Sequence, residues 1–349
     1  MNFRAADFFF GLVSNRFLSK LLWTAAILGP AEPAFAVIIE TVPVGNPGNP
    51  GDTSGGVSSF GSVGYTFNMG KFEITTGQYA EFLNAVAVTD TYGVYNPLMN
   101  AADINGSNIK RTGSIGSYTY TVGDGSPTDV ANWANRPVNG ISWGDAARFA
   151  NWMHNGQPIG PQGLSTTEDG SYFLNGSFSQ GALLAVTRKP NATWVIPSEN
   201  EWYKAAYHKN DGVTGNYWEY PFGSNLYPNN GNPEGDTGNT ANFFDGDYAI
   251  GGPYWRTNVG YFGLSGSPYG TFDQGGNVWE WTEAVIGTGR GTRGGYFGWL
   301  DEMWSGTRVG LVPNAGGGGY GFRLAEIPEP GSIVMFALAS AWIIRRRWT

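Results

Sequence analysis

Cysteine is absent from this 349-residue sequence, and histidine occurs only twice, as His154 and His208. Without cysteine the chain can form no disulfide, present no thiolate to copper or zinc, and offer no thiol nucleophile or redox pair. A metal site built on histidines would require both of them to converge, and two unrelated histidines near helix ends are the simpler interpretation. The sequence therefore excludes thiol chemistry and disfavours histidine-bound metals.

Charged residues are also scarce, at 14% of the sequence, whereas glycine occurs 54 times and proline 20 times. This composition is typical of chains rich in loops and turns, and it disfavours helical bundles. Hydrophobic residues at 41% and aromatic residues at 15% are enough for a sizeable core, which disfavours bulk disorder. The length fits one large domain or two small ones.

Most of the charges are acidic. Residues 37–327 carry 14 lysine and arginine residues against 25 aspartate and glutamate residues, a balance of −11. An acidic domain of this kind disfavours nucleic-acid binding, which depends on basic side chains that face phosphates. The same composition is compatible with calcium, which prefers oxygen ligands.

Residues 1–36 have the pattern of a secretory signal peptide. Basic residues precede the apolar run LLWTAAILG, and the sequence Ala-Phe-Ala that ends at Ala36 has the form of a cleavage site. The alternative is an N-terminal membrane anchor, for which the apolar run is short. Cleavage after Ala36 would leave a domain at residues 37–326.

Residues 327–349 combine a Pro-Glu-Pro motif, an apolar run and three consecutive arginines. The apolar run is shorter than the ~20 residues of an ordinary membrane span, and the arginines would stay on the cytoplasmic side. This three-part end resembles the PEP-CTERM sorting signal, which implies a Gram-negative bacterium and processing by an exosortase-type enzyme. A plain C-terminal membrane anchor is the alternative. In either case residues 37–326 would lie outside the inner membrane.

The hydrophobic pattern between these ends predicts a mixed α+β domain. Alternation within residues 59–74 predicts a strand pair with one buried face. Helices are predicted where a capping residue precedes an apolar face: after Thr75 or Thr76, after Ser142 with Asp145, and after Ser198, which forms a capping box with Glu201. Residues 210–275 are irregular, which in a compact domain is usually functional or needs a ligand to order it.

Six segments, in this order, resemble the formylglycine-generating enzyme/sulfatase-modifying factor family: MGKFEITTGQYAEFLNA, RPVNGISWGDAARFANW, WVIPSENEWYKAAY, YGTFDQGGNVWEW, RGG and YGFRLA. The resemblance covers roughly residues 57–325. The resemblance implies a C-type-lectin-like α+β fold with few helices, short strands and much ordered loop, often stabilised by calcium.

The resemblance also implies calcium sites. One would use the segment around GNVWEW, with ligands from Asp273, Gly276, Val278 and Glu280. A second would use Asn242 and Phe243 followed by an acid, for which Asp245 and Asp247 are both candidates. Carboxylate and carbonyl oxygens suit this hard cation. The alternative for Glu280 is a salt bridge or a helix-cap role between two core tryptophans.

The resemblance fails at the residues that carry the family's chemistry. Its oxidase members use two cysteines, five residues apart, to bind copper, and these positions correspond here to Trp299 and Trp304. Tryptophan offers neither a thiolate for Cu(I) nor a redox pair, so no copper is expected. A non-haem iron branch of the family uses histidines from a partner domain, which this sequence does not provide.

Three functions remain open. The first is a binding module for a polysaccharide or peptide, with Trp299, Asp301, Glu302, Trp304 and Arg308 as the ligand-binding residues, because tryptophans stack on sugar and peptide faces. In this case the tryptophans would face outward, whereas the alternative is that they fill space inside the domain. The second is an enzyme with altered, cysteine-independent chemistry, in which Asp301 and Glu302 act as acid and base. The third is a purely structural protein of the cell envelope or extracellular matrix.

Overall fold

The computed structural model describes residues 36–54, 59–231, 235–299 and 302–328. The domain described below lies within the unit Val37–Thr349. The predicted signal peptide and sorting segment therefore lie almost wholly outside the described residues. Among the described residues, no helix has the length and apolar character needed to cross a membrane.

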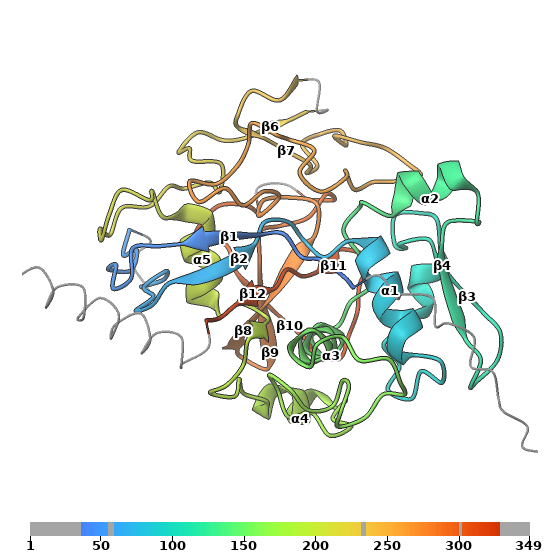
Figure 1. Cartoon of the computed structure of the whole chain (residues 1–349). Coiled ribbons are helices and arrows are strands. Elements are labelled where there is room, and N and C mark those ends of the chain that lie inside the picture. The colour runs from blue at the N-terminus through green and yellow to red at the C-terminus, as the bar shows by residue number, and fades with distance from the viewer. Residues whose placement is uncertain (1–35, 55–58, 232–234, 300–301, 329–349) are drawn as a thin grey trace, which may run out of the picture. The chain divides into compact units, whose positions relative to one another are not determined.

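The first sheet of the Val37–Thr349 unit joins the two ends of the domain (Figure 1). Its strand order is β1 (Thr41–Val44), β2 (Phe67–Gly70), β12 (Ala325–Glu326) and β5 (Trp194–Val195), and all neighbours are antiparallel. The predicted strand pair within residues 59–74 is wrong in detail. Only β2 forms there, and it pairs with β1 and β12, because strand partners depend on contacts distant in sequence.

The second sheet is built on a hairpin. β8 (Trp279–Ile286) and β9 (Gly289–Arg293) pair antiparallel, with an irregularity between Trp281 and Val285. β10 (Val309–Leu311) extends the sheet beyond β9, and β11 (Tyr320–Gly321) lies parallel to β8. Two small ribbons complete the strands: β3 (Ile109–Thr112) with β4 (Thr119–Val122), and β6 (Asn229–Asn230) with β7 (Thr240–Ala241).

The helices are short, and all of them except α2 (Pro127–Trp133) begin at a residue whose side chain caps the first turn. They are α1 (Thr76–Val86), α2 (Pro127–Trp133), α3 (Trp143–His154), α4 (Gln180–Ala185) and α5 (Glu199–Tyr207), with a 3-10 turn at Pro97–Asn100. Complete capping boxes precede α1, α3 and α5, at Thr75/Gln78, Ser142/Asp145 and Ser198/Glu201. The predicted helix starts and the α+β class are therefore confirmed, since each cap satisfies backbone N–H groups that the helix itself leaves free.

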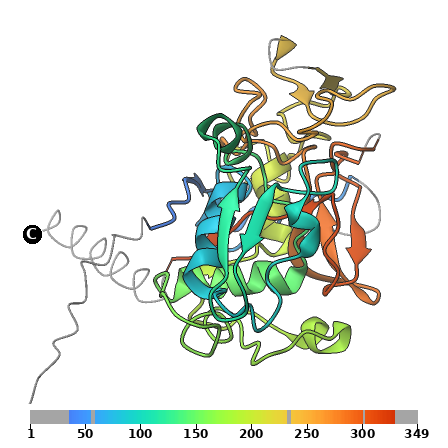
Figure 2. The same ribbon diagram turned by 90° about the vertical axis from the view of Figure 1, so that its right-hand side faces the viewer.

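An aromatic core lies between α1, α3 and the strand ends. Tyr79 and Phe82 of α1 pack against Phe149 of α3, with ring centroids 6.0 and 5.2 Å apart, and Phe322 stands edge-on to Phe149 at 5.4 Å. β4 packs on α1, as Figure 2 shows from the side. Offset and edge-on packing suits the charge distribution of aromatic rings and adds to the gain from burial.

A fully buried ion pair ties α3 to the loop that follows it. The Nε of Arg148 donates to Glu168 at 2.7 Å and its Nη2 at 3.1 Å, and the two side chains are only 2% and 1% exposed. The backbone N–H of Gly176 also donates to Glu168, at 2.7 Å. Such a pair is costly to break, because removing one partner leaves an uncompensated charge in the interior.

We predict that Arg148→Met lowers the free energy of unfolding by about 3–5 kcal/mol, as expected when a buried charge loses its partner. Urea unfolding of the purified domain measures the change. The double variant Arg148→Met/Glu168→Met should recover part of the loss. Lys71→Met, which breaks an exposed pair with Glu40, should cost less than about 1 kcal/mol. Equal losses for the two single variants would contradict this interpretation.

Candidate functional site

Three of the sequence motifs meet just before β8. Asn242 lies beside Gly276 in a parallel bridge, and the N–H of Asn277 donates to the carbonyl of Asn242 at 2.9 Å. The N–H of Gly276 donates to the carbonyl of Gly294 at 2.9 Å, and that of Phe297 to Asn277 at 3.1 Å. Gly276 has a φ of +84°, and a Cβ there would overlap the carbonyl oxygen of Asn242. Only glycine fits this junction.

The segment from β9 to β10 is held through its backbone. The buried guanidinium of Arg293 donates to the carbonyls of Ser305 and Thr307 at 2.8 and 3.0 Å. The hydroxyl of Tyr207, on α5, donates to the carbonyl of Met303 at 2.9 Å. The Met303 side chain is buried in a small apolar cluster with Tyr220, Phe222, Ala241 and Phe243. These contacts anchor the described part of the segment on the domain.

Trp299 and Trp304 stand out from this anchored backbone. Trp299 is 62% exposed and Trp304 is 42% exposed, whereas Met303 between them is 1% exposed. Neither tryptophan therefore fills an interior space. Two large exposed aromatic side chains on a fixed segment form a surface that a ligand could contact.

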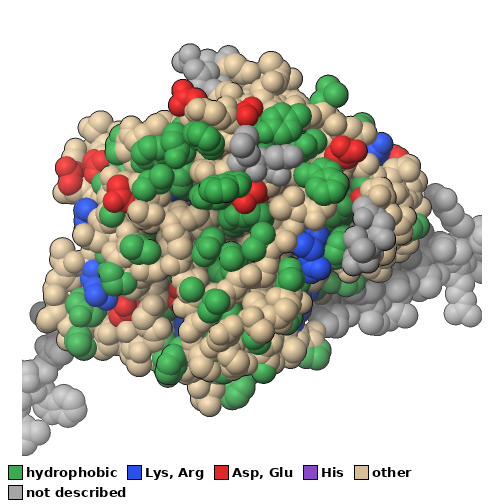
Figure 3. Space-filling view, turned by 180° about the vertical axis from the view of Figure 1, so that it is seen from behind, with side chains coloured by type: hydrophobic (Ala, Val, Ile, Leu, Met, Phe, Trp, Pro, Cys, Tyr) green, Lys and Arg blue, Asp and Glu red, His purple; other side chains and the backbone are tan. Residues whose placement is uncertain are grey.

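Figure 3 shows that apolar side chains gather in patches on the face seen from behind, with acidic side chains between them. Apolar exposure is not confined to the two tryptophans: Leu226, Tyr227, Tyr261 and Leu264, from the irregular region predicted at residues 210–275, are also exposed. Patches of this kind on a protein surface commonly mark interaction sites.

Glu302 is the half-buried carboxyl group of the same segment. Burial raises its pKa to about 7, while a hydrogen bond from the Trp279 side chain acts in the opposite direction. Its Oε2 is buried and has no hydrogen-bond partner. A Cβ on Gly295 would lie 2.8 Å from the Cβ of Glu302, so the double-glycine turn allows this close approach. Glu302 is thus a carboxyl group with unused hydrogen-bonding capacity.

The two remaining predicted ligand-binding residues are placed differently. Arg308 donates to Glu199 at 2.5 Å, and its guanidinium lies 5.0 Å from the centre of the Phe60 ring. Glu199 also accepts from Arg293 at 2.9 Å, so Arg308 belongs to an ion-pair network around the start of α5. Asp301 lies outside the described residues.

Two of the predicted calcium ligands share a buried charge cluster. Both oxygens of Glu280 accept from Arg323, at 2.6 and 2.7 Å, and the indole N–H of Trp202 also donates to Glu280 at 2.7 Å. Asp273 is buried and has a left-handed backbone, with a φ of +58°. Burial raises its pKa to about 6, against a backbone hydrogen bond from Gly260. The salt bridge considered for Glu280 is therefore present.

Glu73 joins this cluster, although no sequence motif predicted a role for it. Its side chain is buried and neither carboxylate oxygen has a hydrogen-bond partner. Burial raises the pKa of Glu73 well above its usual range, and the nearby carboxylates of Asp273 and Glu280 raise it further. Three buried carboxyl groups therefore face one arginine. The only available signal was an acid within the conspicuous segment MGKFEITTG.

The negative charge of this cluster would suit a cation. The cluster does not, however, supply enough free oxygen atoms to form a complete ligand shell. Glu73 and Asp273 have oxygens free to bind a cation, whereas Glu280 is committed to Arg323. Within the described ranges, no three histidine or acidic side chains are grouped as a metal site would require. Calcium at Asp273, Gly276, Val278 and Glu280 stays a prediction.

At the second predicted calcium position the amide group donates to neutral partners, whereas the Oδ1 of Asn242 is buried and has no hydrogen-bond partner, so calcium there stays a prediction. Asn242 is buried, and its amide donates to the carbonyl of Trp255 at 3.0 Å and to the side chain of Asn277 at 2.8 Å. Phe243 packs in the apolar cluster with Met303. Asp245 and Asp247 lie on an exposed turn of the chain, where the carboxylate of Asp247 accepts from the N–H of Tyr248.

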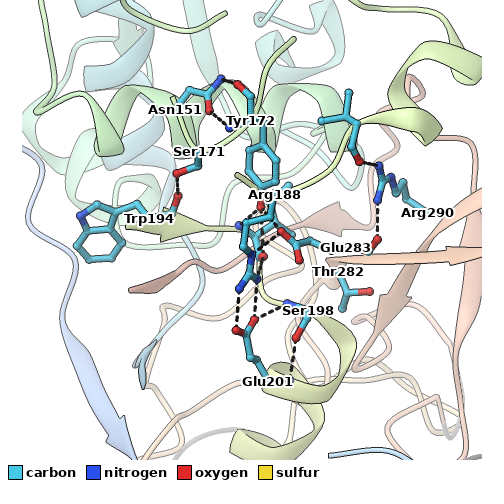
Figure 4. A network of polar contacts seen from close by, with 12 residues as sticks. Asn151, Ser171, Tyr172, Arg188, Trp194, Ser198, Glu201, Thr282, Glu283 and Arg290 are labelled. Atoms are coloured by element: carbon cyan, nitrogen blue, oxygen red, sulfur yellow. Dashed lines mark hydrogen bonds and ion pairs between the residues drawn. The ribbon is translucent and has the colours of Figure 1, made fainter. Parts of the chain in front are cut away.

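A separate polar network centres on Arg188, and no motif indicated it (Figure 4). Arg188 donates to both oxygens of Glu201 at 2.8 and 2.7 Å and to Glu283 at 2.8 Å. Tyr172 donates to the same oxygen of Glu283 at 2.6 Å. Glu283 lines two hollows of about 220 and 330 Å³. Because these partners are far apart in sequence, only the fold reveals the network.

Comparison of the sequence with models of known protein families gives a match that covers most of the chain. The model described as the sulfatase-modifying factor enzyme 1-like domain, FGE-sulfatase, matches residues 61–327. No curated protein matches the sequence.

Solved structures with a similar fold include Treponema denticola variable protein 1, at 16% identity and a TM-score of 0.50, covering 85% of this chain and 98% of that one. CarF is 20% identical with a TM-score of 0.48, covering 84% and 100%. PvdO from Pseudomonas aeruginosa is 17% identical with a TM-score of 0.43, covering 83% and 91%. At such identities the likeness concerns the fold alone.

Glu302 should make stability depend on pH. Because its folded-state pKa is raised to about 7 from an ordinary 4.5, its contribution to stability is complete below pH 4.5 and is lost as the pH rises through 7. Glu302→Gln, which cannot ionise, should therefore raise the free energy of unfolding at pH 8 and change it little at about pH 4.5. Urea unfolding at both pH values measures this.

Glu219→Gln is the matched control, because Glu219 is exposed and its backbone contacts the same segment through Ser305. Its effect should be the same at both pH values. An effect of Glu302→Gln that is also independent of pH would contradict the raised pKa.

Proposed function

The chain belongs to the sulfatase-modifying factor enzyme 1-like, or FGE-sulfatase, family, and we propose that it acts as a non-catalytic ligand-binding module. Its ligand would rest on Trp299 and Trp304 and contact Glu302. The copper chemistry of the family's oxidase members requires thiolates, and this sequence contains no cysteine.

The exposure of the two tryptophans is the observation that carries this proposal. A loop that had merely lost its function would be free to bury such large apolar side chains or to replace them. Here the backbone is held by Arg293 and Tyr207, whereas both indoles face solvent. Indoles on a fixed backbone lose little conformational entropy on binding, and they stack on the apolar faces of sugars and on peptide groups.

We predict that Trp304→Ala and Trp299→Ala each weaken ligand binding about tenfold or more, as expected for the central aromatic residues of a binding surface. Calorimetry of the domain with envelope polysaccharides and peptides measures the affinity. Phe178→Ala is the control, because Phe178 is 71% exposed and lies before α4, away from this segment. Binding that survives both tryptophan replacements would overturn the proposal.

We also propose that the domain is exported. This rests on the secretory pattern of residues 1–36 and on the resemblance of residues 327–349 to a sorting signal. An exosortase-type enzyme would process the C-terminal segment after its transient contact with the inner membrane. The domain would then act in the periplasm, at the cell surface or in the extracellular matrix, where an aromatic surface could serve binding or assembly.

Calcium is proposed as a structural ion at the Asp273 loop, where it would offset the excess negative charge of Glu73 and Asp273. We predict that calcium raises the free energy of unfolding, by about 2.7 kcal/mol at about 100 times its dissociation constant. Thermal unfolding in calcium, in magnesium and in a chelator measures this. Asp273→Asn should abolish the effect, whereas Asp211→Asn, at an exposed site, should preserve it. Identical unfolding in calcium and in the chelator would exclude the site.

A further inference from the structure

Glu283 of β8 is fixed in position by its backbone and by one of its two carboxylate oxygens. It lies in the irregular part of β8, where its N–H donates to the carbonyl of Pro197 at 3.0 Å rather than to β9. Its own carbonyl accepts from Arg290 at 2.5 Å. Its Oε1 accepts from Tyr172 and Arg188 at 2.6 and 2.8 Å, as Figure 4 shows. An irregularity of this kind re-directs a side chain, and these contacts give that of Glu283 a defined orientation.

The second carboxylate oxygen of Glu283, Oε2, is free to bind a ligand. Among the described residues it accepts no hydrogen bond, and it is not one of the buried oxygens that lack a partner. The side chain of Glu283 is 18% exposed and that of Arg188 is 19% exposed. The Nη1 of Arg188 donates to Glu201 and keeps a second N–H without a partner. A free acceptor and a free donor therefore belong to one ion pair.

Two hollows share Glu283 as part of their walls. The first is about 220 Å³, and two arginines and two of its apolar side chains line it beside Glu283: Arg188, Arg290, Val186 and Val285. The second is about 330 Å³, and two uncharged polar side chains line it beside Glu199: Ser198 and Asn200. A hollow with apolar walls and a few fixed polar groups is the usual form of a small-molecule site.

The charges around the first hollow balance. Arg188 and Arg290 supply two positive charges, and Glu201 and Glu283 supply two negative ones. In the second hollow the carboxylate of Glu199 is likewise paired with arginine. An ionic ligand would have to displace one of these pairs or add an uncompensated charge, and both are costly away from bulk water. The hollows therefore favour a neutral ligand that can both donate and accept hydrogen bonds.

A sugar ring meets these requirements. Each hydroxyl group both donates and accepts, so two adjacent hydroxyls could donate to Oε2 of Glu283 and accept from Nη1 of Arg188. The C–H groups of the ring would face the apolar side chains of Val186 and Val285. In one trans peptide group, by contrast, the N–H and C=O point in opposite directions, so a single group could reach only one of the two polar atoms. This difference favours a sugar over a peptide.

We propose that the two hollows at Glu283 form a binding site for a neutral sugar residue, with Glu283 as hydrogen-bond acceptor and Arg188 as donor. Their volumes lie near the lower end of the range of small-molecule sites, about 300–1,000 Å³, which suits one or two sugar rings. The inference goes beyond the proposed function, because it does not require the surface at Trp299 and Trp304 to bind any ligand.

Neutral trisaccharides of glucose, galactose, mannose and N-acetylglucosamine are the probes, and NMR titration of the purified protein measures their affinities. We expect at least one to bind. Glu283→Gln should weaken that binding about tenfold or more, because the carboxamide keeps an oxygen for Arg188 and Tyr172 but presents N–H groups to the hollows. Glu219→Gln, at an exposed glutamate, is the matched control and should leave the affinity unchanged.

A second pair of variants tests the site without altering the ion pair. Val285 is 53% exposed and lines the first hollow, so Val285→Trp would fill that hollow and should also weaken binding about tenfold or more. Ile115→Trp is the control, because Ile115 is 77% exposed and lies in the turn between β3 and β4. Circular dichroism of each variant verifies that it folds.

The inference is overturned if none of the four trisaccharides binds, or if either Glu283→Gln or Val285→Trp binds them as the unaltered protein does. Binding of a neutral capped peptide, acetyl-trialanine amide, in place of every sugar would also overturn it. If Trp304→Ala abolishes binding of the trisaccharides, they bind at the tryptophan surface, and the inference fails while the proposed function stands. If neither tryptophan replacement affects any binding and Glu283→Gln abolishes it, the proposed function fails and the inference stands.

Discussion

The rest of the structure depends on one buried guanidinium group, that of Arg323, because it joins three separate segments of the domain. It binds both oxygens of Glu280 on β8, and it donates to the carbonyls of Gly70 and Phe272 at 2.9 and 2.8 Å. The first sheet, the loop before β8 and β8 itself thus meet at one side chain. A planar fork of five donors suits this role, whereas a lysine could not reach three segments at once.

The candidate binding surface follows from that junction. Glu280 fixes the start of β8, and Trp279 immediately before it points its indole N–H toward Glu302. The turn at Gly294 hydrogen-bonds to Gly276, so the loops before β8 and after β9 lie together. The cluster of Glu73, Asp273 and Glu280 therefore adjoins the strand and loop that carry Trp279 and Gly276.

Features that depend on residues close together in the sequence could be predicted from it. Features that depend on contacts between distant residues could not. The capping boxes at Ser142 and Ser198 were predictable because a cap and its partner are three residues apart. The α+β class followed from composition, and the family from ordered motifs. The role of Glu73 and the network of Arg188 were not predictable, because their partners lie many residues away. Nor does spacing determine whether a tryptophan in a loop faces solvent or the core.

The way in which the segment after β9 is anchored explains how its chemistry can differ within an unchanged fold. Arg293 and Tyr207 hold it through the carbonyl oxygens of Ser305, Thr307 and Met303, and carbonyl oxygens are the same for every side chain. The side chain at position 304 takes no part in these anchoring contacts. A different side chain there would leave the same carbonyl oxygens available to Arg293 and Tyr207. Function in this fold thus depends on side chains that the scaffold does not need.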